Sequence, residues 1–333
     1  MIRSGKNTGA NSISGFRVAA GAAARRSSKI ENRKSKISQT TPPTPRQPQM
    51  LQCEENTNSI KYHVKLFIQR NQQKFKNNVV IDAPAGAGVT SRILKEVGAV
   101  VRAYDLFPEY FKVDGLTCER ADIMQGIPAP DNFADVLICQ EGIEHFSDQY
   151  RVFQEFSRVI KPNGSLFITT PNYSNLQSRL SHFLFETEYF LKMMPANEAD
   201  SVWMANPSLS KEIYLGHIFL IGILKLRLLA KLSGFRIKRI IFTYPKTTSL
   251  VLLPFAYPFI WLASWWTYRK SIRKPSSAPM ALRRQVYREI TKLNTSARIL
   301  VDKYLFVEFE KEAELETVRT TLHSQHRTFD RMT

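Results

Sequence analysis

The sequence predicts an α/β fold built on a doubly wound, mainly parallel sheet, and two observations support this fold class. Short strand-like apolar runs recur at 79–81, 99–104, 134–139 and 165–170, with helical stretches between some of them. The run at 79–81 is apolar without alternation, as expected of a parallel strand that is covered on both faces. Alternating strands and helices are typical of a doubly wound sheet.

Apolar residues at helical spacing predict the elements around these strands. Ile60, Val64 and Phe67 recur at three to four residues, which predicts a helix within 58–75 that packs on the sheet. The clearest helix is predicted at 148–160, before a turn that contains Gly164.

A later helix is predicted to end at Gly234, and residues 236–242 are predicted to form a sixth strand. The residues expected on the buried face of this helix are Leu224, Leu228, Leu229 and Leu232.

Composition and charge limit the classes of partner. The chain has 333 residues and a formal net charge of +18, and its 43% hydrophobic content is sufficient for a full core. The basic excess lies in residues 1–49 and 235–303, whereas the region between them is nearly balanced. No nucleic-acid partner is therefore expected. The three cysteines and six histidines lack metal-site spacing, so we expect no metal and reduced thiols in a cytosolic protein.

A loop of small residues follows the first predicted strand, in the segment VVIDAPAGAGVTSRIL. Gly86 and Gly88 carry no Cβ atom, so the backbone can approach a ligand closely. Asp82 precedes the loop, where its carboxylate would repel a pyrophosphate but suit a cationic amino group. This favours S-adenosylmethionine over a dinucleotide, whose third glycine would fall at Ser91.

Carboxylates follow the next strands as well. Asp105 ends the second strand, where it can accept hydrogen bonds from both hydroxyls of a ribose. Asp122 comes after the segment 117–121 and can accept a hydrogen bond from an adenine amino group, although a lone aspartate here is as often a turn cap. The segments FADVLICQEGIEHF and RVIKPNGSLFITTPN then supply the fourth strand, a helix end, a turn and the fifth strand.

As a set, these motifs resemble the class I S-adenosylmethionine-dependent methyltransferases of the small-molecule type (methyltransferase type 11/12-like), similar to those acting on quinone precursors, lipids and sugars. The resemblance covers roughly 58–242. It implies a Rossmann-like doubly wound seven-stranded sheet, with six parallel strands, an antiparallel seventh and helices on both faces. The cofactor would be S-adenosyl-L-methionine. The cofactor-binding residues that the resemblance implies are Asp82, Ala85, Gly86, Gly88, Asp105, Asp122, Ile123, Gln140 and Glu141.

One position departs from the family loop, which has a glycine where this chain has Pro84. Proline suits this position only if φ is near −65° and no amide donor is needed. For catalysis, an oxygen acceptor needs a base to remove its proton, and His145 or His217 is suited to that role at neutral pH. Glu141 or Glu144 would orient such a base.

Residues 250–266 form a stretch of seventeen residues without a charge, followed by a basic cluster up to 274. A spanning helix needs about 20 apolar residues, and Pro254 and Pro258 interrupt this one. Tryptophans beside basic residues are typical of a segment in the headgroup region. We therefore expect an interfacial or re-entrant anchor, with a buried helix pair as the alternative. Apolar residues between 171 and 234 indicate an apolar acceptor or a lid that closes on one, with simple core packing as the alternative.

These patterns predict five segments: a disordered basic leader (1–49), the methyltransferase core (50–245), a membrane-associating insertion (246–302), the last strand (303–311) and a tail (312–333). Met50 is a candidate start of translation. The expected function is methyl transfer to a small, lipid-linked or amphiphilic acceptor by a cytoplasmic protein that is peripheral or monotopic on the inner face of a membrane. The alternatives are a membrane-attached cofactor-binding protein without turnover and a nicotinamide-dependent enzyme.

Overall fold

The computed structural model describes residues 50–186, 219–276 and 278–321; the predicted leader and His217 lie outside these ranges. The strands are β1 (Val79–Asp82), β2 (Val100–Asp105), β3 (Cys118–Arg120), β4 (Ala134–Gln140), β5 (Ile160–Pro171), β6 (Phe235–Ile240) and β7 (Tyr304–Lys311). The helices are α1 (Met50–Glu55), α2 (Ile60–Arg70), α3 (Val89–Glu96), α4 (Gln149–Val159), α5 (Leu176–Phe185), α7 (Ile223–Leu232), α8 (Thr247–Arg273), α9 (Met280–Asn294) and α10 (Ala297–Val301). Short 3₁₀ turns are η1 (Gln72–Lys74), η2 (Pro108–Tyr110) and η3 (Ile143–His145).

The seven strands form one sheet in the order β3-β2-β1-β4-β5-β7-β6. Six strands run parallel, and β7 runs antiparallel to both of its neighbours, β5 and β6. The predicted doubly wound sheet with an antiparallel seventh strand is therefore confirmed. Its parallel strands end at one edge, where loops carry the candidate site.

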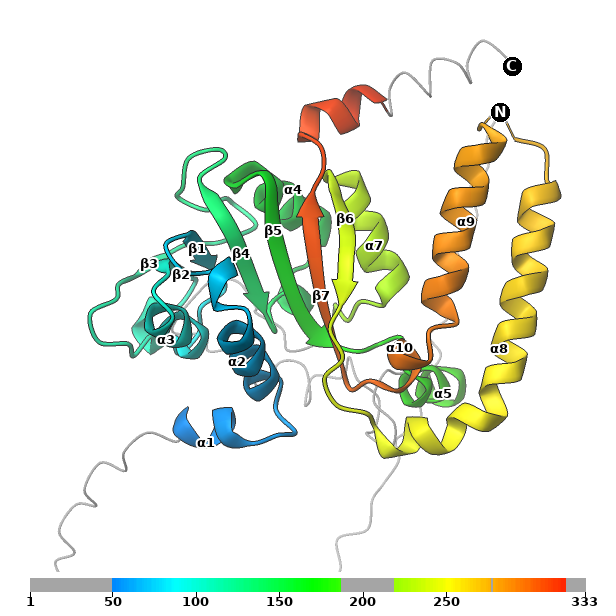
Figure 1. Ribbon diagram of the computed structural model, residues 1–333, viewed down its shortest axis with the longest axis horizontal. Helices are drawn as coiled ribbons and strands as arrows, with labels where there is room; N and C mark the ends of the chain where they lie inside the picture. Colours follow the sequence, from blue (N-terminus) through cyan, green and yellow to red (C-terminus); the bar gives the residue numbers. More distant parts are fainter. Residues whose placement is uncertain (1–49, 187–218, 277, 322–333) are drawn as a thin grey trace, which may run out of the picture. The chain divides into compact units, whose positions relative to one another are not determined.

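Helices cover both faces of the sheet, as Figure 1 shows. On one face, Phe153 and Phe156 of α4 and Leu226 of α7 join a buried cluster with residues of β4, β5 and β7. On the other, Ile68 of α2 and Ile93 of α3 form a second cluster. Burial of these side chains stabilises the layers by about 1.5–3 kcal/mol for each fully buried large apolar residue.

The predicted buried face of α7 is wrong in part: Leu229 packs against the core cluster, but Leu224 and Leu228 do not belong to the buried face. Leu224 and Leu228 are 37% and 52% exposed, whereas Ile223, Leu226 and Ala230 are buried. The exposed leucines and the buried residues each recur at helical spacing in the α7 sequence ILKLRLLAKL. Periodicity alone therefore does not decide which of the two faces of the helix packs on the core.

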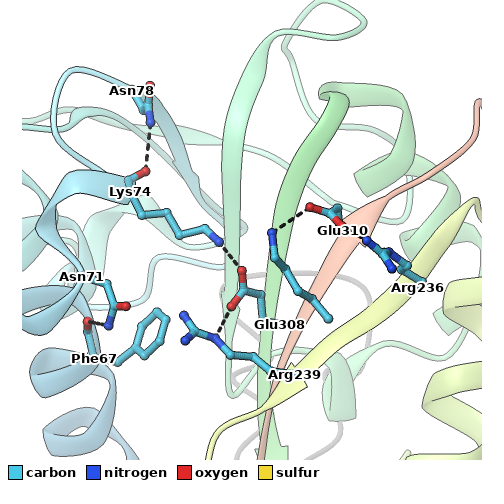
Figure 2. A network of polar contacts seen from close by, with 9 residues as sticks. Phe67, Asn71, Lys74, Asn78, Arg236, Arg239, Glu308 and Glu310 are labelled. Carbon is cyan, nitrogen blue, oxygen red and sulfur yellow. Dashed lines mark hydrogen bonds and ion pairs between the residues drawn. The ribbon is translucent and has the colours of Figure 1, made fainter.

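An ionic network fixes the outer strands to the helical layer (Figure 2). Glu308 of β7 is fully buried and forms ion pairs with Lys74 of η1 and Arg239 of β6. The guanidinium of Arg239 also lies 4.9 Å from the ring centroid of Phe67 in α2. The network thus holds β7, and with it the loop that precedes β7, against the rest of the sheet.

Residues 246–302 lie between β6 and β7 and form α8, α9 and α10. With 27 residues, α8 is about 40 Å long. It continues through Pro254 and Pro258, which we expected to interrupt it. In the part of the chain that the structure describes, α8 is the one helix long and apolar enough to cross a membrane, and only 11% of its most apolar window is buried. Figure 1 shows α9 beside it.

Candidate functional site

The glycine loop joins β1 to α3 and is fixed to the end of β2. The amide of Ala85 donates to the carbonyl of Tyr104 at 2.9 Å. The amide of Gly86 donates to the Oδ2 atom of Asp105 at 2.7 Å. One side-chain carboxylate of β2 therefore holds the loop in place.

The two glycines of the loop differ in their surroundings. Gly86 has a φ of +53°, and no atom lies within 4 Å of the place that a Cβ atom would take. Its backbone is therefore open to a ligand. At Gly88, with φ +87°, a Cβ atom would lie 2.4 Å from Val113 and 2.7 Å from Phe111. The missing side chain of Gly88 therefore makes room for Phe111 and Val113, which follow η2, and not for a ligand.

Asp82 and Asp105 are buried beside each other at the ends of β1 and β2. Asp82 accepts a hydrogen bond of 2.6 Å from the hydroxyl of Ser91. Burial raises its pKa to about 7, against the effect of this hydrogen bond, and the charge of Asp105 adds to the rise. Within the described residues neither carboxylate forms an ion pair. The place fits a ligand that carries positive charge.

The end of β3 lies next to that of β2, because the amide of Ala121 donates to the carbonyl of Asp105 at 2.9 Å. Asp122 follows, and its Oδ1 atom accepts a hydrogen bond of 3.0 Å from the amide of Met124. Part of its carboxylate thus caps a turn. Ile123 is buried in the core cluster of that face.

Gln140 and Glu141 stand where β4 ends, next to β1. The Oε1 atom of Gln140 accepts a hydrogen bond from the hydroxyl of Thr90 in α3. Glu141 has a φ of +49°, a conformation that is unusual for a residue with a side chain. Its amide donates to the carbonyl of Thr169 at 3.0 Å, and its buried Oε1 atom has no hydrogen-bond partner among the described residues.

Glu144 lies one turn further, in η3, and is fully buried. Neither of its carboxylate oxygens has a hydrogen-bond partner within the described residues. Burial raises the pKa of both Glu141 and Glu144, the charge of Glu141 raises that of Glu144 further, and the nearby hydroxyl of Thr170 acts in the opposite direction on Glu144. Lys303 and Lys61 act in the opposite direction on Glu141.

His145 is the last residue of η3 and is partly exposed; its amide donates to the carbonyl of Gly142 at 3.0 Å. The structure thus brings Glu141, Glu144 and His145 together after β4. The other histidine that we considered as a base, His217, lies outside the described residues.

Sequence reasoning missed Gly142, which explains how the loop accommodates Pro84. A Cβ atom on Gly142 would lie 2.4 Å from the Cδ atom of Pro84 and 3.1 Å from the sulfur of Cys139. The proline ring therefore occupies the space that the missing side chain leaves. The sequence EGIEH contains the glycine, but nothing in it indicates the contact with a loop on another strand.

Comparison with known proteins agrees with this arrangement. Residues 81–168 match the family described as "Methyltransferase domain". The chain is 29% identical over 152 residues to a ubiquinone biosynthesis O-methyltransferase of Leptothrix cholodnii, covering 43% of this chain and 64% of that protein. It is 30% identical over 128 residues to the same enzyme of Xylella fastidiosa, covering 35% and 50%. It thus spans less than two thirds of these relatives.

Among solved structures, the chain is similar to a SAM-dependent methyltransferase from Archaeoglobus fulgidus, with a TM-score of 0.46 and 17% identity. The alignment covers 79% of this chain and 100% of that one. The sequence-based prediction of a methyltransferase domain with S-adenosylmethionine as its cofactor is confirmed.

Gly142→Ala is expected to displace the glycine loop, because the new methyl group would overlap the ring of Pro84. Overpacking of this kind costs about 1–3 kcal/mol, so we expect a lower midpoint of thermal unfolding and weaker S-adenosylmethionine binding in a calorimetric titration. The double variant Pro84→Gly, Gly142→Ala is expected to recover much of both. Wild-type affinity in the single variant would contradict the proposed contact.

Proposed function

We propose that this chain, which carries a class I S-adenosylmethionine-dependent methyltransferase domain, transfers a methyl group to a hydroxyl oxygen of a small amphiphilic or lipid-linked acceptor at a membrane surface. One observation carries the proposal. Three buried carboxylates, those of Asp82, Asp105 and Glu144, lie at the carboxyl ends of adjacent strands beside the half-buried Glu141, and none of the four forms an ion pair within the described residues.

The cofactor side consists of the ends of β1, β2 and β3. Buried carboxylates without a cation are costly, and a ligand with sulfonium and ammonium charges offsets that cost. Asp82 and the open backbone at Gly86 suit the cationic methionine end, and Asp105 suits the ribose. We assign the remaining predicted contacts to Ala85, Asp122, Ile123, Gln140 and Glu141, whereas Gly88 makes room for Phe111 and Val113.

The acceptor side begins at Glu141 and Glu144. Bound S-adenosylmethionine supplies an electrophilic methyl group, so the protein has to orient the acceptor and take its hydroxyl proton. Two neighbouring buried carboxyls do not ionise together easily, so the pair retains a proton to higher pH than a free carboxyl. Once deprotonated, the pair is a stronger base than an exposed glutamate, and the adjacent His145 completes this set.

The relatives support an oxygen acceptor that is joined to a lipid, because they are named as O-methyltransferases of ubiquinone biosynthesis. The second support is the surface of α8. Its outward residues recur at three to four positions and form a continuous apolar stripe, each more than half exposed: Val251, Phe255, Phe259, Leu262 and Trp266. In contrast, the buried residues of this helix are Ser249 and Ser264. An apolar stripe of this length on the outside of a helix suits a lipid surface.

The neighbouring helix favours binding at the membrane surface over a span. Arg284, Arg288 and Lys292 recur four residues apart along α9 and are exposed. Because α9 packs against α8, insertion of the hairpin across a bilayer would carry these charges into hydrocarbon. We therefore place the α8 stripe at the boundary of headgroups and acyl chains, with the basic stripe of α9 near lipid phosphates, on the cytoplasmic face of a membrane.

Glu144→Gln is expected to lower kcat for methyl transfer to a phenolic acceptor by about 100-fold or more. In the wild type, kcat should rise with pH through the neutral range, because burial and mutual repulsion raise the pKa of the pair and only its deprotonated form accepts a proton. The variant should lose this rise but still bind S-adenosylmethionine in calorimetry. The exposed Glu119→Gln serves as control.

An unchanged pH profile in Glu144→Gln would exclude the carboxyl pair as proton acceptor. Cofactor binding by the wild type without transfer to any membrane extract would instead favour a binding protein without turnover.

Replacing Phe255, Phe259 and Trp266 by serine is expected to reduce binding to phosphatidylglycerol vesicles at least tenfold, because each buried aromatic side chain stabilises membrane binding by about 1.5–3 kcal/mol. A cosedimentation assay measures the bound fraction. The control replaces Val100 and Tyr110, which are about half exposed and lie on β2 and η2, away from α8. Equal loss in both variants, or none in the first, would refute the assignment of α8.

A further inference from the structure

Three segments that are distant in sequence meet beside the acceptor side of the site. The amide of Lys303 donates to the carbonyl of Tyr244 at 2.7 Å, and the amide of Lys246 donates to the carbonyl of Val301 at 2.8 Å. The ammonium of Lys303 donates to the carbonyl of Asn58 at 3.1 Å, just before α2. These bonds bring the start of α8, the start of β7 and the start of α2 to one place.

This place adjoins the end of β5 and the loop after β4. The amide of Asn172, the residue after β5, donates to the carbonyl of Lys303 at 3.1 Å. The backbone amide of Glu141 is held by the carbonyl of Thr169 in β5, and the carboxyl of Glu141 lies close enough for the charges of Lys303 and Lys61 to act on it. Neither lysine, however, forms an ion pair with Glu141.

Lys61, Lys246 and Lys303 are the cations of this cluster, and each is partly buried. Within the described residues, the ammonium groups of Lys61 and Lys246 have no hydrogen-bond or ion-pair partner. Burial lowers the pKa of Lys246, and the charge of Lys303 lowers it further. Partly desolvated cations that repel one another gain from an anion between them.

The N-terminus of α8 adds positive charge to this lysine cluster. Lys246 is the N-cap residue of α8, and its side chain makes no capping hydrogen bond with the first turn. The first turn also contains no acidic residue. The positive end of a 27-residue helix therefore coincides with the cluster.

We propose that Lys61, Lys246 and Lys303 bind an anionic oxygen group, a carboxylate or phosphate, of the methyl acceptor. The assignment rests on the proposed methyl transfer and names a substrate class for it: an amphiphile that carries a reacting hydroxyl and an anionic group. The lysines hold the anion, while the buried carboxyls of Glu141 and Glu144 face the hydroxyl. Opposite charges at the two ends of the acceptor site fix the orientation of the substrate.

The test compares 3,4-dihydroxybenzoate with its neutral methyl ester, in calorimetric titrations of the full chain saturated with S-adenosylhomocysteine. We expect the acid to bind about tenfold or more tightly than the ester, since hydrogen bonds between charged groups are stronger than those to a neutral ester. Lys246→Gln and Lys61→Gln should each remove most of this preference without changing affinity for the ester. The control Lys65→Gln, one turn further along α2, and the exposed Lys225→Gln should retain it.

Equal binding of acid and ester by the wild type, or an unchanged preference in Lys246→Gln, would overturn the anion site. Weaker binding of Lys246→Gln to phosphatidylglycerol vesicles with an unchanged acid preference would assign the cluster to lipid phosphate instead, which also overturns it. Methyl transfer assays separate the two proposals. If both compounds are methylated with the same KM, the anion site is wrong and the proposed methyl transfer is supported. If the acid binds more tightly than the ester but neither is methylated, the anion site is supported and the proposed methyl transfer is wrong.

Discussion

Burying a carboxylate without an ion-pair partner costs several kcal/mol, and this protein does so with Asp82, Asp105 and Glu144 at one edge of its sheet, beside the half-buried Glu141. Asp82 and Asp105 end neighbouring strands, and Glu141 and Glu144 follow the strand on the other side of β1. No ion pair within the described residues compensates these groups. The arrangement makes sense if a positively charged ligand binds there, and the backbone around Gly86 is open to receive one.

The order of the strands connects this site to the proposed membrane surface. Because β7 is inserted between β5 and β6, the chain must cross the sheet edge before it enters β7. Residues 246–302 are inserted in that connection, so α8 begins beside the loop that carries Lys303. An acceptor held with its tail in lipid at α8 would thus have its polar end near the buried carboxyls. Arg227 and Glu289 form an ion pair of 2.6 Å that ties α9 to α7 and keeps the hairpin in this position.

Features with a local cause could be predicted from the sequence. The strand positions, the glycine loop and the antiparallel last strand follow from apolar runs, small residues and a family resemblance, and the structure has them. The buried stripe of α7 could not be predicted, because Leu224 and Ile223 begin equally periodic stripes and tertiary packing selects one. The continuity of α8 through Pro254 and Pro258 could not be predicted either, because each proline removes a backbone donor and local sequence favours an interruption there.

The candidate site, like the fold, could be predicted only where its residues have a local sequence signal. Asp82 and Asp105 stand next to strands, and sequence position alone indicated them. That Gly142 makes room for Pro84 and that the charge of Lys303 acts on Glu141 depend on contacts between segments far apart in the chain. No local pattern contains such information.

The central claim is that the buried carboxylates receive a cationic cofactor, and proton-linked calorimetry tests it most directly. Since burial holds the pKa of Asp82 at about 7, a bound cation should lower it and release part of a proton near pH 7. Titration with S-adenosylmethionine in two buffers of different ionisation enthalpy should therefore show proton release and tighter binding as pH rises, and Asp82→Asn should lose both. Binding that is independent of pH, without proton release, would contradict the account.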